Sequence, residues 1–596
     1  MNAFSQSDRS SLRVEALEGR VLLSVGAPGD PGFGVEIQTS VRTIYVDDNA
    51  SGDPGPNDPN VSDPSEDGSA DHPFDRVLEG VNAAANGDTV LILAGTYHEW
   101  GIDLGGKAIT VTGANPDDPA VVAATILDGN LQGSIFVLDS SETSSTVITG
   151  LTMQDGGLLG NNYGGAIYCS GSSPTISKNI IQDNAIGQAG GGIASIGGAP
   201  TITQNSFVGN YGPYGGGIYV AGGSTATIED NVFTDNSATY GGAIYIVGSS
   251  PTIQGNQIYG NEANGGGGIY IGASSSPTIS HNTITGNKGG IYGGGGILAM
   301  DSSPVITSNT FSGNQVTGAK GGAISFRGST GVIFDNILWD DSADSGNEIA
   351  LASSTVVSGM TVTYCDVEGG EGGVYVAAGS TLTWGSGNID ANPVFADAGL
   401  WSGGVWTEGD YHLQSRIGRW DPSAGGGAGA WVTDGAHSPC IDAGQRGSSY
   451  SNEPEPNGDR VNMGAYGNTG EASKSIAWDK VDGDGDGAED LGRMDDSGQW
   501  LITTSQGHTE VWGTWSTAVT WEVILPADFT GDGKVDIAGG TDAGEWWLAV
   551  STGSGFTNQL WGAWSTGVTW SDVMVGDYTG DGRRTSWVGR TPGSGG

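Results

Sequence analysis

A block of about 26 residues recurs seven times between Gly164 and Asp341. Each block contains a glycine pair that leads into an isoleucine, and these isoleucines are Ile167, Ile193, Ile218, Ile244, Ile269, Ile297 and Ile324. A short Thr-Ile or Val-Ile segment follows, and then an apolar residue lies between two asparagines, as in Asn205–Asn210. Each block therefore has three strand-sized apolar segments, which are too short for helices.

Three short strands cannot bury an apolar face alone, so we expect each block to stack on its neighbours at the ~4.8 Å spacing of paired strands. The repeat therefore predicts an all-β fold, a parallel β-helix with three strands per coil. Alternation places Ile218 and Val220 inside the coil and Tyr219 outside. The core should be a stack of aliphatic side chains.

The corners of the coils carry two further signals. The asparagines that share one register suit a ladder of side-chain amides, and they are Asn179, Asn205, Asn231, Asn256, Asn282, Asn309 and Asn336. The glycine pairs can supply the positive φ that a tight corner requires. These blocks resemble the right-handed repeats of pectate-lyase-like proteins, and the Gly-Gly-Ala-Ile and Phe-x-x-Asn pairing is similar to that of chlamydial polymorphic outer-membrane proteins. Right-handed coiling follows from this resemblance and from the general preference of crossovers.

Composition excludes several classes of protein. Glycine is frequent, 108 of 596 residues, but has no Gly-X-Y period, so the chain is not collagen-like. The 21 basic and 67 acidic residues give a net charge of −46, which makes nucleic acid and anionic lipid poor partners. No apolar run approaches the ~20 residues of a membrane span. Cys169, Cys365 and Cys440 form no disulfide or metal pattern and fit small core residues.

The pattern divides the chain into four parts. Residues 1–40 are expected to be a disordered tail, in which Leu17–Ser24 resembles a short motif of large exported planctomycete proteins, with Gly19 in place of the motif's proline. Residues 41–386 are the expected β-helix, with regular coils at 164–341 and an amphipathic capping helix at Phe74–Ala85. Residues 387–473 resemble the anchor-type module that closes many bacterial surface β-helix proteins, or form a loop-rich cap. The resemblances imply an exported protein that works outside the cell or at its surface.

Residues 474–596 form a second, tryptophan-rich repeat: Trp512–Trp521 returns as Trp561–Trp570. Acidic loops accompany it and place oxygens at calcium-loop positions around a glycine. The candidate ligands are Asp482, Asp484, Asp486 and Asp490, then Asp528, Thr530, Asp532 and Asp536, and in a third loop Asp577 and Asp581, where Thr585 replaces the ninth-position aspartate. Because no loop has the twelfth-position glutamate of an EF-hand, the pattern resembles the integrin-type (FG-GAP/VCBS-like) loops of β-propellers. This resemblance implies that the loops bind calcium and that the segment is an incomplete β-propeller. The alternative is that each loop is a solvated acidic turn.

Catalysis is not evident in the regular coils. A polysaccharide lyase needs calcium-binding carboxylates beside an Arg or Lys base, and residues 141–330 contain only four basic residues without such a cluster. In contrast, Tyr219, Tyr245 and Tyr270 share one outward position on three successive coils. They could form an aromatic strip that binds sugars, or could simply shield one another and the sheet.

The sequence thus favours an exported, calcium-binding, non-catalytic surface or matrix protein that binds polysaccharide or an extracellular protein. The alternative is a pectate-lyase-like polysaccharide lyase that acts on acidic glycans.

Overall fold

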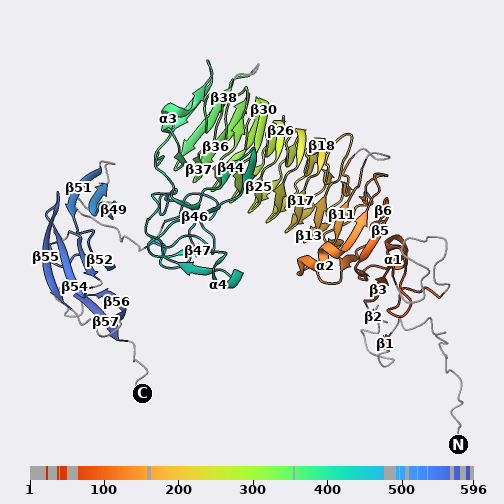
Figure 1. Ribbon diagram of the computed structural model, residues 1–596, viewed down its shortest axis with the longest axis horizontal. Helices are drawn as coiled ribbons and strands as arrows, with labels where there is room; N and C mark the ends of the chain where they lie inside the picture. Colours follow the sequence, from red (N-terminus) through yellow and green to blue (C-terminus); the bar gives the residue numbers. More distant parts are fainter. Residues whose placement is uncertain are drawn as a thin grey trace, which may run out of the picture.

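The computed structural model describes residues 22–24, 36–38, 41–49, 65–157, 163–352, 356–458, 460–475, 491–494, 497–503, 509–519, 521–532, 534–541, 543–563, 570–576 and 585–590. These residues form a right-handed parallel β-helix followed by small antiparallel sheets (Figure 1). The predicted fold class is therefore confirmed.

Three long parallel sheets form the walls of the β-helix. Sheet I has 13 strands: β3 (Thr43–Val46), β4 (Thr89–Ile92), β7 (Thr110–Gly113), β10 (Val147–Thr149), β13 (Thr175–Ser177), β16 (Thr201–Thr203), β20 (Thr227–Glu229), β24 (Thr252–Gln254), β28 (Thr278–Ser280), β32 (Val305–Thr307), β36 (Thr330–Phe334), β39 (Gly359–Thr363) and β42 (Thr381–Trp384). Sheet II has 11: β5 (Gly95–His98), β8 (Thr125–Asp128), β11 (Thr152–Gln154), β14 (Ile180–Gln182), β17 (Ser206–Val208), β21 (Val232–Thr234), β25 (Gln257–Tyr259), β29 (Thr283–Thr285), β33 (Thr310–Ser312), β37 (Ile337–Trp339) and β40 (Asp366–Val367). Sheet III also has 11: β6 (Ile102–Asp103), β9 (Phe136–Leu138), β12 (Ile167–Ser170), β15 (Ile193–Ile196), β19 (Ile218–Ala221), β23 (Ile244–Ile246), β27 (Ile269–Ile271), β31 (Ile297–Met300), β35 (Ile324–Arg327), β38 (Ile349–Ala352) and β41 (Tyr375–Val376).

The core is the predicted stack of aliphatic side chains. Ile218 pairs with Ile244, and Ile244 pairs with Ile269, in parallel register. All three are fully buried, with a relative exposure of 0%. Short three- and four-residue strands suffice because each side chain packs against its equivalents above and below, so that one dry axis runs through the coils.

The predicted asparagine ladder is confirmed, and a second ladder runs parallel to it. In the first, the side-chain amide of Asn256 donates to the Oδ1 of Asn282 (2.9 Å), and its own Oδ1 accepts from the amide of Asn231 (3.0 Å). In the second, the members are Asn184, Asn210, Asn236, Asn261, Asn287 and Asn314, followed by Asp341. All are buried, so both ladders satisfy backbone groups that the corners would otherwise leave without partners.

The corners contain more left-handed backbone than the glycine pairs explain. The first glycine of each pair has a positive φ, as Gly241 does at +67°. The residue before each member of the first ladder also lies in this region, and at several coils it is not glycine, as at Gln204, Asp230 and His281. The asparagine ladder holds this corner in shape even where the side chain makes a positive φ costly.

Five coils gain a fourth sheet that the sequence did not indicate. Sheet IV comprises β18 (Tyr211–Tyr214), β22 (Ser237–Tyr240), β26 (Glu262–Gly265), β30 (Lys288–Gly293) and β34 (Gln315–Val316). It lies between the second ladder and sheet III, because each segment connects an asparagine of that ladder to the next glycine pair. These segments lack the apolar alternation of a strand, and pairing with the neighbouring coils imposes their extended shape.

The N-terminal end is closed by the predicted capping helix, α1 (Val77–Ala83), which buries Val77 and Val81 against the first coil. The carboxylate of Glu99 accepts hydrogen bonds from the backbone N–H groups of Val77 (2.6 Å) and Leu78 (3.1 Å) at its first turn. Two further short helices, α2 (Pro119–Ala124) and α3 (Gly370–Gly373), lie in connections between strands. The β-helix therefore does not expose its core at this end.

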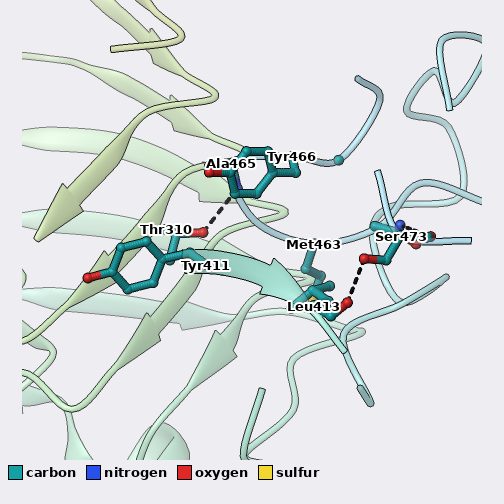
Figure 2. Close-up of a pocket in the computed structure, with 9 residues that line it drawn as sticks. Thr310, Tyr411, Leu413, Met463, Ala465, Tyr466 and Ser473 are labelled. Atoms are coloured by element: carbon teal, nitrogen blue, oxygen red, sulfur yellow. Dashed lines mark hydrogen bonds between the residues drawn. The ribbon is translucent and has the colours of Figure 1, made fainter. Parts of the chain in front are cut away.

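The segment after the last coil folds back along the side of the β-helix (Figure 1). Its elements are β43 (Phe395–Asp397), β44 (Leu400–Ser402), β45 (Val405–Thr407), β46 (Asp410–Leu413), β47 (Arg419–Asp421), α4 (Ala424–Gly427) and β48 (Ala430–Val432). Figure 2 shows the contact, where the backbone N–H of Ala465 donates to the Thr310 hydroxyl (3.0 Å). Tyr411, Met463 and Tyr466 help to line a cavity of about 10 Å³ there, which is the size of one water molecule. The segment therefore packs closely against sheet II.

The remaining elements are antiparallel. β1 (Leu22–Ser24) pairs with β2 (Glu36–Gln38); the rest of the expected tail, including residues 17–21 of the export-type motif, lies outside the described residues. The tryptophan-rich segment contains β49 (Leu491–Met494), β50 (Gln499–Thr503), β51 (Thr509–Thr514), β52 (Trp521–Ala527), β53 (Asp536–Thr541), β54 (Glu545–Ser551), β55 (Phe556–Ala563), β56 (Trp570–Gly576) and β57 (Thr585–Arg590). The four strands β52–β55 form one antiparallel sheet, and an incomplete propeller stays a prediction.

Candidate functional site

The predicted tyrosine column exists on the outer face of sheet III. Tyr219, Tyr245 and Tyr270 are register partners on β19, β23 and β27. The rings of Tyr219 and Tyr245 stack at 5.6 Å between centroids and 15° between planes, and those of Tyr245 and Tyr270 at 4.8 Å and 3°. The two faces of Tyr245 are therefore covered by its neighbours, and this half-buried residue can present only its ring edge and hydroxyl to solvent.

A second group of tyrosines joins this column from sheet IV and its flanks. Tyr214 and Tyr240 stack on each other at 6.0 Å and pack edge-on against the column, at 5.1 Å from Tyr245 and 5.2 Å from Tyr270 respectively. We call the continuous set of eight rings the tyrosine cluster; its members are Tyr163, Tyr168, Tyr214, Tyr219, Tyr240, Tyr245, Tyr270 and Tyr292. The second group was not predicted from the sequence, although Tyr163, Tyr214 and Tyr240 each stand directly before a glycine pair.

The exposed aromatic surface of the cluster comes from its sheet IV side. Tyr214 is 41% exposed, whereas Tyr270 is buried. Tyr211, on the same strand as Tyr214 but not a member of the cluster, is 49% exposed. A hydrogen bond with Tyr292, followed by burial, raises the pKa of Tyr240 to about 12. Burial and the neighbouring phenols raise the pKa of Tyr245 as well. These phenols therefore stay neutral at physiological pH, and they can act as hydrogen-bond donors but not as nucleophiles.

One end of the cluster carries an acidic and a basic residue. The hydroxyl of Tyr270 contacts the Sδ of Met300 (3.4 Å). Burial and then the charge of Asp301 raise the pKa of Tyr270, while the charge of Arg327 opposes this shift. Asp301 and Arg327 lie on adjacent coils, since the backbone N–H of Asp301 donates to the carbonyl of Arg327 (3.0 Å). Because Arg327 is the one arginine of the regular coils, only here does a guanidinium act together with a carboxylate on a phenol among the described residues of these coils.

The other three basic residues of the regular coils are engaged elsewhere. Lys178 forms an ion pair with Asp117. Lys288 donates to the carbonyl of Gly404 (2.7 Å) and lies over the Trp401 ring, and Lys320 donates to Ser345 (2.7 Å). A hollow of about 410 Å³ on the outer face of sheet I, near β32, β36, β39 and β42, has no ionisable side chain in its lining. Neither the three lysines nor this hollow offers acid–base chemistry.

The second predicted calcium loop is the only one whose candidate ligands are all described. The carboxylate of Asp536 accepts hydrogen bonds from the backbone N–H groups of Phe529 (3.0 Å), Thr530 (3.0 Å) and Ser551 (2.8 Å) and is fully buried. Asp528 likewise accepts from the N–H groups of Gly531 and Asp532, and Lys534 forms an ion pair with Asp532 (3.2 Å). Asp536 therefore fixes the loop, while the oxygens of Asp528, Thr530 and Asp532 are of the type that calcium binds.

The other calcium candidates lie outside the described residues, namely Asp482, Asp484, Asp486, Asp490, Asp577 and Asp581. Among the described residues, only Glu66, Asp75 and Glu79 bring three potential ligand groups within 4.8 Å of one another. Burial and the neighbouring Asp75 raise the pKa of Glu79 to about 7. The three carboxylates at Asp528, Asp532 and Asp536 do not come this close, so calcium at that loop stays a prediction.

Comparison with known proteins gives one family. The family model described as "Right handed beta helix region" matches residues 108–266 and 216–412, which together cover just over half of the chain. No curated protein sequence matches at a significant level. None of the helices among the described residues has the length and apolar character to cross a membrane.

Several solved structures share similarity with the chain. The pectate lyase Pel9A has 14% identity, a TM-score of 0.38, and coverage of 72% of this chain and 96% of that one. XylC in complex with xylose has 10% identity, a TM-score of 0.35, and coverage of 61% and 88%. A PL6 alginate lyase in complex with a trisaccharide has 15% identity, a TM-score of 0.33, and coverage of 62% and 92%.

Proposed function

The chain belongs to the family described as right handed beta helix region, and we propose that it is a non-catalytic protein that binds polysaccharide through the tyrosine cluster. The observation that carries this proposal is the continuity of the cluster. Eight rings form one aromatic surface on the junction of sheets III and IV, to which the coil with Ala194 contributes no ring. Aromatic rings with a polar hydroxyl are well suited to sugars, which present both apolar C–H faces and hydroxyl groups.

The stacked rings determine how a sugar would bind. The faces of Tyr245 are covered, so the column offers ring edges and hydroxyls as hydrogen-bonding groups. Tyr214, and Tyr211 beside the cluster, are the exposed rings that a sugar ring would contact. Because equivalent residues repeat at the ~4.8 Å coil spacing, the surface suits a linear chain that runs along the β-helix axis.

The charge of the protein favours a neutral polysaccharide. The net charge of −46 repels uronate chains over distances of about a Debye length, ~8–10 Å at physiological salt. The charge of Arg327 acts on the Tyr270 phenol of the cluster, and the opposite charge of Asp301 acts on the same phenol. A neutral glycan avoids this repulsion.

We predict that Tyr214→Ala lowers affinity for the bound polysaccharide about tenfold, which corresponds to roughly 1.4 kcal/mol for a lost ring contact. Tyr245→Phe, which removes one hydroxyl and keeps the stacked ring, is expected to lower affinity about two- to tenfold. The measurement is affinity electrophoresis with xylan, mannan, β-glucan, polygalacturonate and alginate.

Trp100→Ala is the matched control, since Trp100 is 47% exposed and lies outside the cluster. It should bind like the wild-type protein. If the wild-type protein binds a glycan and both tyrosine variants bind it equally well, the proposed surface is wrong.

The alternative function, a polysaccharide lyase, has one supporting observation. Arg327 and Asp301 lie on adjacent coils and their charges act on the phenol of Tyr270, so an arginine, a carboxylate and a phenol are available near one another there. The same polysaccharide panel distinguishes the two functions: a lyase releases unsaturated uronates that absorb in the ultraviolet, and Arg327→Ala would abolish the product. A non-catalytic protein releases no such product.

We also propose that the loops that begin at Asp482, Asp528 and Asp577 bind calcium and that the protein works outside the cell or at its surface. The support for calcium is the spacing of the oxygen-bearing residues. The support for export is the motif at Leu17–Ser24. Calcium titration calorimetry of the full chain tests the first of these proposals.

A further inference from the structure

The second asparagine ladder ends on an acid. Asp341 occupies the position that an asparagine holds in the six preceding coils. Its Oδ1 accepts from the backbone N–H of Asn314 (2.6 Å) and from the side-chain amide of Asn314 (2.8 Å), as an asparagine oxygen would. However, a carboxylate has no N–H with which to continue the ladder.

The next partner of Asp341 is a second acid. The backbone N–H of Asp341 donates to the Oε1 of Glu348 (3.2 Å). Asp341 is 4% exposed and Glu348 is 2% exposed. Their remaining oxygens, Asp341 Oδ2 and Glu348 Oε2, are buried and have no hydrogen-bond partner other than each other's carboxyl group. Two ionised carboxylates in this position would repel each other without water to screen them.

No cation compensates the pair among the described residues. The charged and titratable groups that act on it are Asp340 on the same turn and Glu368 beyond β40, both acidic. From the C-terminal segment, Tyr411 faces Asp341 and also Glu408. The lysine of the adjacent coil, Lys320, donates to Ser345 and lies over the Tyr375 ring instead. Every charged neighbour that acts on the pair therefore disfavours a second negative charge.

We propose that Asp341 and Glu348 share one proton and so form a pH-sensitive lock at the C-terminal end of the second ladder. One carboxyl group donates to the other, which replaces the amide-to-oxygen bond of the preceding coils. Burial raises the pKa of both groups, and the charge of Asp341 raises the pKa of Glu348 further, so the folded protein holds this proton at a pH where the unfolded chain has released it. Its stabilising effect is complete below the unfolded carboxyl pKa of about 4 and is lost as the pH rises through the folded pKa.

The test compares thermal unfolding of the full chain and of Glu348→Gln from pH 4 to pH 9. The glutamine amide replaces the shared proton with a permanent N–H donor. We therefore expect the thermal midpoint of the variant, relative to that of the wild-type protein, to increase by about 3–8 °C as the pH rises over this range. Asp341→Asn, which restores the ladder residue, should behave in the same way. The infrared spectrum of the wild-type protein at neutral pH should show a protonated carboxyl C=O band that Glu348→Gln lacks.

Glu371→Gln is the control, because Glu371 is an exposed acid outside the ladder, and its midpoint should follow that of the wild-type protein at every pH. The proposal is wrong if the thermal midpoints of Glu348→Gln and Asp341→Asn show the same pH dependence as that of the wild-type protein and the infrared band is absent. It is also wrong if a chelator lowers the midpoint of the wild-type protein but not of Glu348→Gln, since a cation would then occupy the pair.

Discussion

Replacing Asn256 by leucine is expected to destabilise the protein by roughly 3–5 kcal/mol, because several buried polar groups lose their partners at about 1–3 kcal/mol each. The Oδ1 of Asn256 accepts two hydrogen bonds from Asn231, and its amide donates to Asn282 and to the carbonyls of Ile228 and Gln254. A leucine of similar volume fills the space but satisfies none of these groups. Denaturant unfolding followed by circular dichroism measures the change.

Asn264→Leu serves as the control, since Asn264 is exposed on sheet IV and its substitution should change stability by no more than about 0.5 kcal/mol. Equal stability of Asn256→Leu and Asn264→Leu would show that the ladder amides do not hold the coils together.

Gly242→Ala is expected to cost at least about 3 kcal/mol or to prevent folding, as an extreme case of an overpacked core. A Cβ at this position would lie 2.2 Å from the carbonyl oxygen of Gly267 on the next coil and 2.8 Å from the N–H nitrogen of Glu262. Both are backbone atoms, so no side-chain rotation can relieve the overlap and the two coils must move apart. Yield of soluble protein and the thermal midpoint are the measurements.

The matched substitution is Gly187→Ala. Gly187 has no positive φ, and a Cβ there would meet nothing within 4 Å. Its replacement should be neutral or should stabilise the fold by about 0.4–1 kcal/mol through the unfolded chain. If Gly242→Ala were as well tolerated as Gly187→Ala, the close stacking of the glycine pairs would be refuted.

The repeat predicts the core because equivalent residues of a regular repeat occupy equivalent positions in the stacked coils. Once the blocks stack, every alternating residue has a fixed side, and Ile244 and Tyr245 fall inside and outside as expected. The first asparagine ladder follows from the same argument. The asparagines of the second ladder repeat just as regularly, five residues after those of the first. A second ladder through Asn236 could therefore have been predicted together with the one through Asn231.

Other features could not be read from the sequence. Sheet IV arises from pairing between coils, and a segment such as Glu262–Gly265 has no strand pattern of its own. The face-to-face stacking that covers Tyr245 depends on side-chain rotation, so an exposed strip and a self-covered column look the same in sequence. The acid pair depends on the burial of Glu348, seven residues after Asp341, which only the path of the turn determines.

The central claim is that the blocks stack in register with one coil per ~4.8 Å. Thr110, Thr252 and Thr361 belong to one outward column of sheet I, and the three native cysteines are buried, so single spin labels can be placed on cysteines at these threonines. Pulsed electron paramagnetic resonance should give about 24 Å between labels at Thr110 and Thr252, and about 43 Å between labels at Thr110 and Thr361, for five and nine strand spacings of ~4.8 Å. Distances that do not grow in proportion to the number of coils would contradict the stacking on which the tyrosine cluster and both ladders depend.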